Sequence, residues 1–157
     1  MASKIEVDEI MNAGGDNDTG IDLATNDQIL LKVANATRLT MNSTGQTTIV
    51  GEGGTTTTSV QQGLCKSWCH FTGTGTIAID DSFNSSSLAD DGTGDYEVLF
   101  TNAMNNANYS AQGATSGDSI RMFAHATTKI DRILCIGHGG SSEDVASVAT
   151  SVDGDLA

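Results

Sequence analysis

Proline is absent from this sequence of 157 residues, and aromatic residues make up only 4% of it. The absence of proline excludes a proline-rich spacer or polyproline segment. Because bulky apolar side chains are few, a single copy of the chain buries little apolar surface on folding. That burial compensates poorly for the conformational entropy that the chain loses. The composition therefore predicts either disorder or an interior shared between copies of the chain. The regular strand pattern described below favours the shared interior.

Basic residues are also few. The sequence contains seven Lys and Arg and twenty Asp and Glu, which gives a formal net charge of −13. Phosphate binding depends on Lys and Arg, so we expect no nucleic-acid partner. No apolar run approaches the length of a membrane span, so we expect no membrane insertion. Met1 leads into the alternating segment Ile5 to Asp8 without a signal peptide, which predicts assembly in the cytoplasm.

Three cysteines, an odd number, give no disulfide framework. On one strand, the Cα atoms of Cys65 and Cys69 would lie roughly 13 Å apart. A disulfide needs a separation of about 4.4–6.8 Å. The cysteines are therefore expected to be small buried apolar side chains.

Short apolar segments alternate with Gly, Ser, Asn and Asp through residues 63–140. In the clearest one, Tyr96, Val98 and Phe100 share one face of an extended segment. Asp91 to Gly94 mark the preceding turn, where glycine supplies positive φ. Further strands are expected at residues 64–71, 76–79, 108–111, 120–125 and 132–136. This number of strands predicts an all-β module, either a β-sandwich or a small barrel-like tip.

Residues 1–50 show a weaker repeat of strand and turn. Strands are expected at 4–7, 21–23, 28–33, 37–41 and 47–50, which predicts a meander. A helix over 28–36 is the competing interpretation, and the Asn, Thr and Val nearby disfavour it. Three copies would intertwine as a prism and bury apolar side chains at a common axis. This homotrimer would use Ile21, Leu23, Leu30, Val33 and Ile49.

Composition divides the chain into four parts. Residues 1–50 form an attachment or shaft region, and residues 51–62 form a Gly/Thr linker of low complexity. Residues 63–140 form the tip module. Residues 141–157 form an acidic tail, in which Ser141 and Asp144 would form a capping box ahead of a short helix. The alternative is a frayed tail.

Five short strings follow one another in order: KSWCHF at 66–71, GTGTIAI at 73–79, DSFN at 81–84, DGTGDYEVLFTNAM at 91–104 and NY at 108–109. Together they resemble the C-terminal module of bacteriophage tail-fibre proteins. Residues 20–45 are similar to the shaft repeats that precede this module in many phage fibres. The tail at 141–157 departs from the family, whose tip ends near the last strand.

The resemblance implies a trimeric virion protein that is located on the tail or capsid surface and attached to other virion proteins through its N-terminus. It implies binding to a host surface glycan or lipopolysaccharide. The alternative is a capsid decoration or head-fibre trimer that stabilises the shell, because the chain is short for a complete tail fibre.

Loops on a rigid scaffold are the usual place for contact residues. The loops at 84–87, 105–108 and 116–118 supply the candidate receptor contacts Asn84, Ser86, Asn105, Asn106 and Asp118. Tyr109 is a further candidate receptor contact, through stacking or hydrogen bonding. Trp68, His70 and Tyr96 are also suited to stacking or hydrogen bonding with a glycan. Trp68 belongs to the family pattern and is expected in the core.

No catalytic motif is present, since the sequence has neither a Gly-x-Ser-x-Gly elbow nor a Gly-rich phosphate loop with Lys. The carboxylates of Asp80 and Asp81 would point to opposite faces of a strand, and the same holds for the adjacent pair Asp90 and Asp91. We therefore expect a binding protein and not an enzyme.

The metal signals are weak as well. Asp16, Asp18 and Asp22 have calcium-loop spacing but fail the full loop pattern, so a plain turn is favoured. His70, His125 and His138 match no zinc spacing, and a site on a three-fold axis is the open alternative. No metal and no cofactor are expected.

Overall fold

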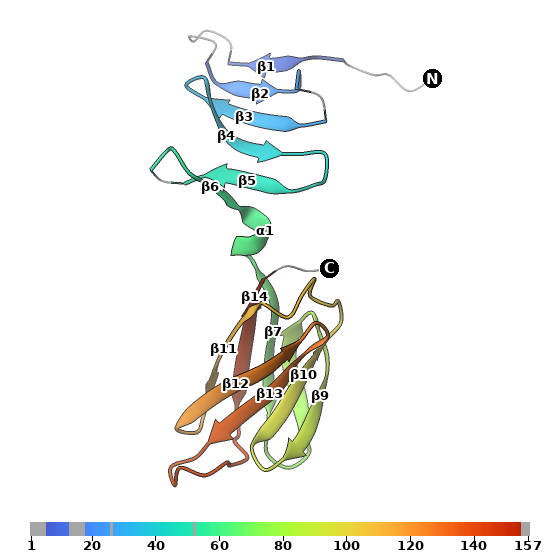
Figure 1. Cartoon of the computed structure of the whole chain (residues 1–157), viewed down its shortest axis with the longest axis vertical. Coiled ribbons are helices and arrows are strands. Elements are labelled where there is room, and N and C mark those ends of the chain that lie inside the picture. Colours follow the sequence, from blue (N-terminus) through green and yellow to red (C-terminus); the bar gives the residue numbers. More distant parts are fainter. Residues whose placement is uncertain (1–5, 13–17, 26, 52, 155–157) are drawn as a thin grey trace, which may run out of the picture. The chain divides into compact units, whose positions relative to one another are not determined.

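The computed structural model describes residues 6–12, 18–25, 27–51 and 53–154 (Figure 1). These residues form antiparallel β-sheets and one helix of four residues, α1 (Val60–Gly63). The chain divides into two compact units, residues 1–63 and residues 64–157. The all-β class expected from the sequence is therefore confirmed.

In the part of the N-terminal unit that the structure describes, six strands form one sheet in which each strand pairs with the next along the chain. Its strands are β1 (Glu9–Met11), β2 (Gly20–Asp22), β3 (Ile29–Val33), β4 (Ala36–Met41), β5 (Thr47–Val50) and β6 (Thr57–Ser59). Ala34 and Asn35 join β3 to β4 with φ angles of 52° and 56°. Two consecutive positive φ angles are typical of a tight hairpin turn. The competing helix over residues 28–36 is therefore excluded.

The described residues of the C-terminal unit, 64–154, form eight strands. They are β7 (Cys65–Thr72), β8 (Ala78–Phe83), β9 (Ser85–Gly92), β10 (Asp95–Phe100), β11 (Ser110–Thr115), β12 (Ser119–Ala126), β13 (Lys129–Ile136) and β14 (Val148–Asp153). One sheet has the order β12-β13-β10-β9, and the other has the order β11-β14-β7-β8. The chain passes from one sheet to the other four times, between β8 and β9, β10 and β11, β11 and β12, and β13 and β14. Neither sheet closes on itself, so the unit is a β-sandwich and not a barrel.

One hydrophobic core lies between the two sheets and draws side chains from both. Tyr96, Val98 and Phe100 of β10 alternate with more exposed residues, as the sequence predicted. The rest of the core consists of Cys69, Phe71, Met104, Tyr109, Ile130, Ile133, Cys135, Val145, Val148 and Val152. The ring of Phe71 meets that of Tyr96 edge-on, at 5.4 Å between centroids, which is a favoured aromatic geometry.

Two segments that were expected to lack strands contain them. Residues 57–63 of the expected linker form β6 and α1. Residues 148–153 of the expected acidic tail form β14, which lies between β11 and β7. The predicted short helix is therefore wrong. Val148, Thr150 and Val152 alternate inward with period two, and burial of this face outweighs the local capping signal.

No helix among the described residues is long and apolar enough to cross a membrane. All three cysteines are free. Cys69 and Cys135 are buried, as expected, whereas Cys65 is exposed.

Candidate functional site

The candidate contact residues fall at opposite ends of the sandwich. Asn84, Asn105, Asn106 and Tyr109 lie at the end where β7 begins, since Asn84 donates to the carbonyl of Lys66 at 3.0 Å. Asp118 follows β11 at the other end, where its side chain pairs with His138. These residues therefore do not converge on one binding site.

Asn84 acts as an internal connector between loops. Its Nδ2 also donates to the carbonyl of Asn102 at 3.1 Å, and its Oδ1 accepts the Asn102 backbone N–H at 2.7 Å. Its φ of 57° places it in the left-handed region that asparagine tolerates. The hydroxyl of Ser86 donates to the carbonyls of Leu99 and Phe100 at 3.2 and 3.3 Å. Both residues therefore already use their polar atoms within the fold.

Tyr109 is buried at 6% exposure and belongs to the core. Its hydroxyl donates to the carbonyl of Lys129 at 2.6 Å, and its ring stacks on His125 with 4.5 Å between centroids. Burial raises the pKa of Tyr109 to about 12. A surface contact through Tyr109 is therefore not available in this structure. Asn105 and Asn106 remain exposed, and Asn106 accepts the N–H of Asn108 in a local turn.

The outward side of the sheet β11-β14-β7-β8 carries a different set of groups. Ser67, Cys69 and Phe71 of β7 point into the core, so Trp68 and His70 point outward. Trp68 is 37% exposed, and the expectation that it belongs to the core is wrong. Its register partner on β8 is Phe83, which is 52% exposed.

We call this outward side the Trp68 face and define it by Trp68, His70, Phe83, Gln112 and Ser151. Gln112, Ser151, Trp68 and Phe83 follow one another in register across the four strands. A shallow hollow of about 320 Å³ lies over β11 and β14. It is lined by Gln112, Gly113, Ala114, Ala149, Thr150 and Ser151.

A hydrogen-bonded chain of three side chains also lies on the Trp68 face. Nδ1 of His70 is 3.0 Å from Oδ2 of Asp80, and Nε2 of His70 is 2.9 Å from Oγ of Ser147. This order matches that of serine hydrolases, which also need N–H donors aimed at a developing oxyanion. The N–H of Ser147 instead donates to Oγ of Ser116 at 3.1 Å. The hydrogen bonds from Asp80 and Ser147 thus orient the His70 ring. The N–H of Ser147 is already donated to Ser116 and therefore does not contribute to an oxyanion hole.

The expectation that Asp80 and Asp81 point to opposite faces is wrong. Pairing between β7 and β8 shifts between His70 and Phe71, and this bulge adds one residue to β8. Asp80 contacts His70, while Asp81 lies directly opposite His70 in register. Both carboxylates therefore lie on the Trp68 face and are exposed.

A scan against family models finds no match, and searches of curated proteins and of solved structures find none either. The site is therefore interpreted from its own geometry.

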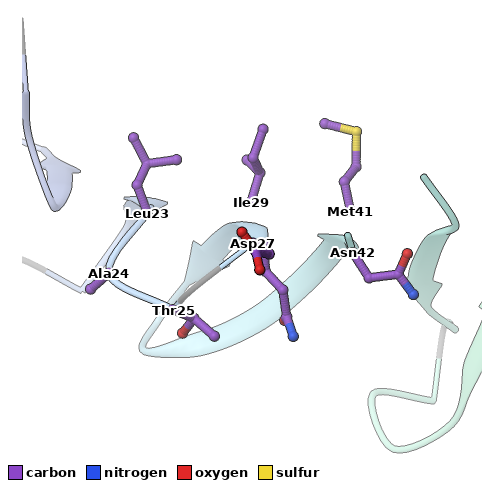
Figure 2. A pocket seen from close by; sticks show the side chains of 8 residues that line it. Leu23, Ala24, Thr25, Asp27, Ile29, Met41 and Asn42 are labelled. Atoms are coloured by element: carbon purple, nitrogen blue, oxygen red, sulfur yellow. The ribbon is translucent and has the colours of Figure 1, made fainter. Parts of the chain in front are cut away.

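The N-terminal unit presents a second candidate surface. One side of its sheet carries a row in register, Ile10, Ile21, Leu31, Leu39 and Ile49. A neighbouring row contains Leu23, Ile29 and Met41, whose side chains project to the same side (Figure 2). These three line an open hollow of about 520 Å³. With Val33, these two rows define what we call the apolar face.

Much of the apolar face is exposed to solvent in a single subunit. Ile10 is 54% exposed, Val33 is 49% exposed and Ile49 is 40% exposed. Of the predicted axis residues, Ile21, Leu23, Val33 and Ile49 share this face. Leu30 lies between Ile29 and Leu31 on β3 and therefore points to the opposite side.

The opposite side of this sheet carries an ion pair besides Leu30. Asp22 is buried at 7% exposure, and its carboxylate pairs with the ammonium of Lys32, which also approaches Glu9 at 3.9 Å. The hydrogen bond from Lys32 holds the pKa of Asp22 below its usual range and raises that of Lys32. Asp22 is thus engaged in an ion pair. The described residues contain no cluster of three or more His, Cys, Asp or Glu suited to a metal, and Asp16 lies outside them.

Proposed function

We propose that this protein is a bacteriophage virion fibre protein that associates as a homotrimer and binds a glycan or lipopolysaccharide on the host surface. Its place is on the tail or capsid surface of the virion, where the N-terminal region attaches it to other virion proteins. It acts by binding and not by catalysis, and it needs no metal or cofactor.

The observation that carries the proposal is the apolar face. Leu31 is 38% exposed and sits in a row of aliphatic side chains that runs across five strands. Soluble monomers rarely expose contiguous apolar patches of this kind, which usually mark an interaction surface. Association of copies through this face removes it from water, in keeping with the sparse apolar content of the chain.

Light scattering of the full chain at micromolar concentration tests the trimer. We expect three times the monomer mass of 16.2 kDa. Leu31→Asp places a charge on the apolar face and should produce monomers. Thr48→Asp adds the same charge on the opposite side of the sheet and should leave the mass unchanged. A monomeric mass for the unmodified chain contradicts the proposal.

A capsid decoration trimer is the second candidate. The six strands of the N-terminal unit contain three to six residues each and form one short sheet, which favours a compact attachment over an extended shaft. Antibody labelling of intact virions separates the two roles. A fibre places a few labels on the tail, whereas decoration distributes many labels over the shell. Virions without any label contradict both.

A further inference from the structure

The Trp68 face exposes two large aromatic side chains next to each other. Trp68 and Phe83 are directly opposite on paired strands, at 37% and 52% exposure. Directly opposite side chains have Cβ atoms about 4.5–5.5 Å apart, so the two aromatic side chains leave the sheet at neighbouring positions on the same face. Single exposed apolar residues are ordinary, but an adjacent aromatic pair on a rigid sheet suggests a surface that receives a ligand.

Space for a ligand lies over β11 and β14, and β14 is the strand that pairs with β7, which carries Trp68. Ser151 is the register partner of Trp68 on β14, and Ala149 is that of His70. These small side chains, with Ala114, form the floor of the hollow of about 320 Å³. That volume falls at the lower end of ordinary small-molecule sites, which suits one or two ring-sized units.

Polar groups border this aromatic surface. Nε2 of Gln112 donates to Oδ2 of Asp153 at 3.3 Å, which orients both side chains at one edge. At the neighbouring row, His70 is held by Asp80 and Ser147. Each of these groups presents donors or acceptors in an arrangement already fixed by the fold, which lowers the ordering cost of binding.

Charge narrows the class of ligand. The Trp68 face carries the carboxylates of Asp80 and Asp81, with Asp153 at its edge, on a chain of net charge −13. Phosphorylated or acidic ligands would be repelled from it. Two copies meeting through this face would bring like charges together. The face therefore fits a small neutral ligand better than a second copy.

We propose that the Trp68 face is a binding site for neutral hexose units of a saccharide. This inference rests on the proposed glycan-binding function and names its site and its sugar class. The C–H face of a pyranose ring lies against the electron-rich faces of Trp68 and Phe83. The hydroxyl groups of a neighbouring ring of the saccharide exchange hydrogen bonds with Gln112, Asp153 and Ser151 on the side of the hollow.

Trp68 provides a direct readout because it is the single tryptophan of the chain. The full-length protein is titrated with soluble oligomers of glucose, galactose and mannose. The same sugars carrying a phosphate or carboxylate form the second arm. We expect at least one neutral oligomer to change the fluorescence of Trp68 and the acidic forms to bind more weakly.

Variants then locate the site by calorimetry. Trp68→Ala and Phe83→Ala should each weaken binding about tenfold or more, which corresponds to about 1.4 kcal/mol. Phe123→Ala is the matched control, because Phe123 is 41% exposed on β12 of the other sheet. It should bind as the unmodified chain does. Circular dichroism verifies that each variant is folded.

Four results overturn this inference: no binding of any oligomer, undiminished binding by Trp68→Ala, tighter binding of the acidic forms, or a changed subunit number in Trp68→Ala. The last result would identify the face as a contact between copies. None of these four results contradicts the proposed place of the protein on the virion. Antibody labelling therefore tests the proposed function separately.

Discussion

The backbone N–H of Gly94 donates a hydrogen bond of 2.7 Å to Oδ1 of Asp144, which lies 50 residues further along the chain. The same oxygen accepts the hydroxyl of Tyr96 at 3.2 Å. One exposed acidic residue thus ties the β9–β10 turn and a buried tyrosine to the segment that leads into β14. Burial, together with the Asp144 carboxylate, raises the pKa of Tyr96 well above its usual range, so its hydroxyl remains a donor.

Replacing Asp144 by alanine should lower the free energy of unfolding of the C-terminal unit by about 1–2 kcal/mol. The N–H of Gly94 loses its side-chain acceptor, and the hydroxyl of Tyr96 loses one of its two acceptors. Urea unfolding monitored by Trp68 fluorescence measures the change. Asp91→Ala, which removes an exposed carboxylate near the same turn, should change the value by about 0.5 kcal/mol or less. Equal losses in both variants would contradict a specific role for Asp144.

Gly73 is required by close packing against Tyr96. A Cβ atom at residue 73 would lie 2.6 Å from the hydroxyl oxygen of Tyr96 and 2.9 Å from the carbonyl oxygen of Val145. Gly73→Ala should therefore destabilise the unit by about 1–3 kcal/mol through overpacking. Thermal unfolding measures the change, and Gly139→Ala, where a Cβ meets nothing within 4 Å, is the control. A melting temperature equal to that of the control would show that the neighbours of Gly73 move aside.

Asp22 makes the N-terminal unit sensitive to acid. Its folded pKa is lowered by Lys32, so its ionised form contributes stability above the unfolded pKa of about 4. That contribution is lost as the pH falls through the folded pKa. Asp22→Asn should thus be less stable than the unmodified chain at neutral pH, and the difference should vanish in strong acid. Urea unfolding across this range measures it, with the exposed Asp8→Asn as control. A difference that persists in acid would assign the effect to packing.

The three thiols should differ in reactivity. Burial raises the pKa of Cys69 to about 11 and also raises that of Cys135, so both remain protonated and shielded. Cys65 is exposed. A thiol reagent at neutral pH should therefore modify one cysteine in the native protein and three after denaturation. Cys65→Ser should abolish the native reaction. Rapid native labelling of Cys69 would contradict the observed core.

Alternation of apolar and polar residues predicted much of the fold. Tyr96, Val98 and Phe100 were placed correctly because their alternation is unambiguous. β9 was not expected, since Ser85–Gly92 offers little apolar signal and is held mainly by pairing with β10. β14 was missed because Ser141 and Asp144 imitate a helix start, and its strand character depends on non-local pairing with β7 and β11.

The candidate site was harder to predict than the fold. Loop position favoured Asn84, and the stacking and hydrogen-bonding capacity of its side chain favoured Tyr109. The polar atoms of both side chains are engaged in internal hydrogen bonds that composition does not reveal. The outward position of Trp68 could have been predicted from its neighbours on the strand, because burial of Cys69 and Phe71 turns the alternate side chains outward. The pairing of Trp68 with Phe83 required the register of two strands, which alternation alone leaves open.

The position of β14 has a consequence for biosynthesis. β7 opens the C-terminal unit, yet one of its two neighbours in the sheet is formed by residues 148–153. During translation, the edges of β7 and β11 that pair with β14 therefore keep unpaired backbone groups until nearly the whole unit has left the ribosome. Such late, long-range pairing is intrinsically slow. A message cut short before codon 148 should accordingly yield chains that aggregate through these open edges.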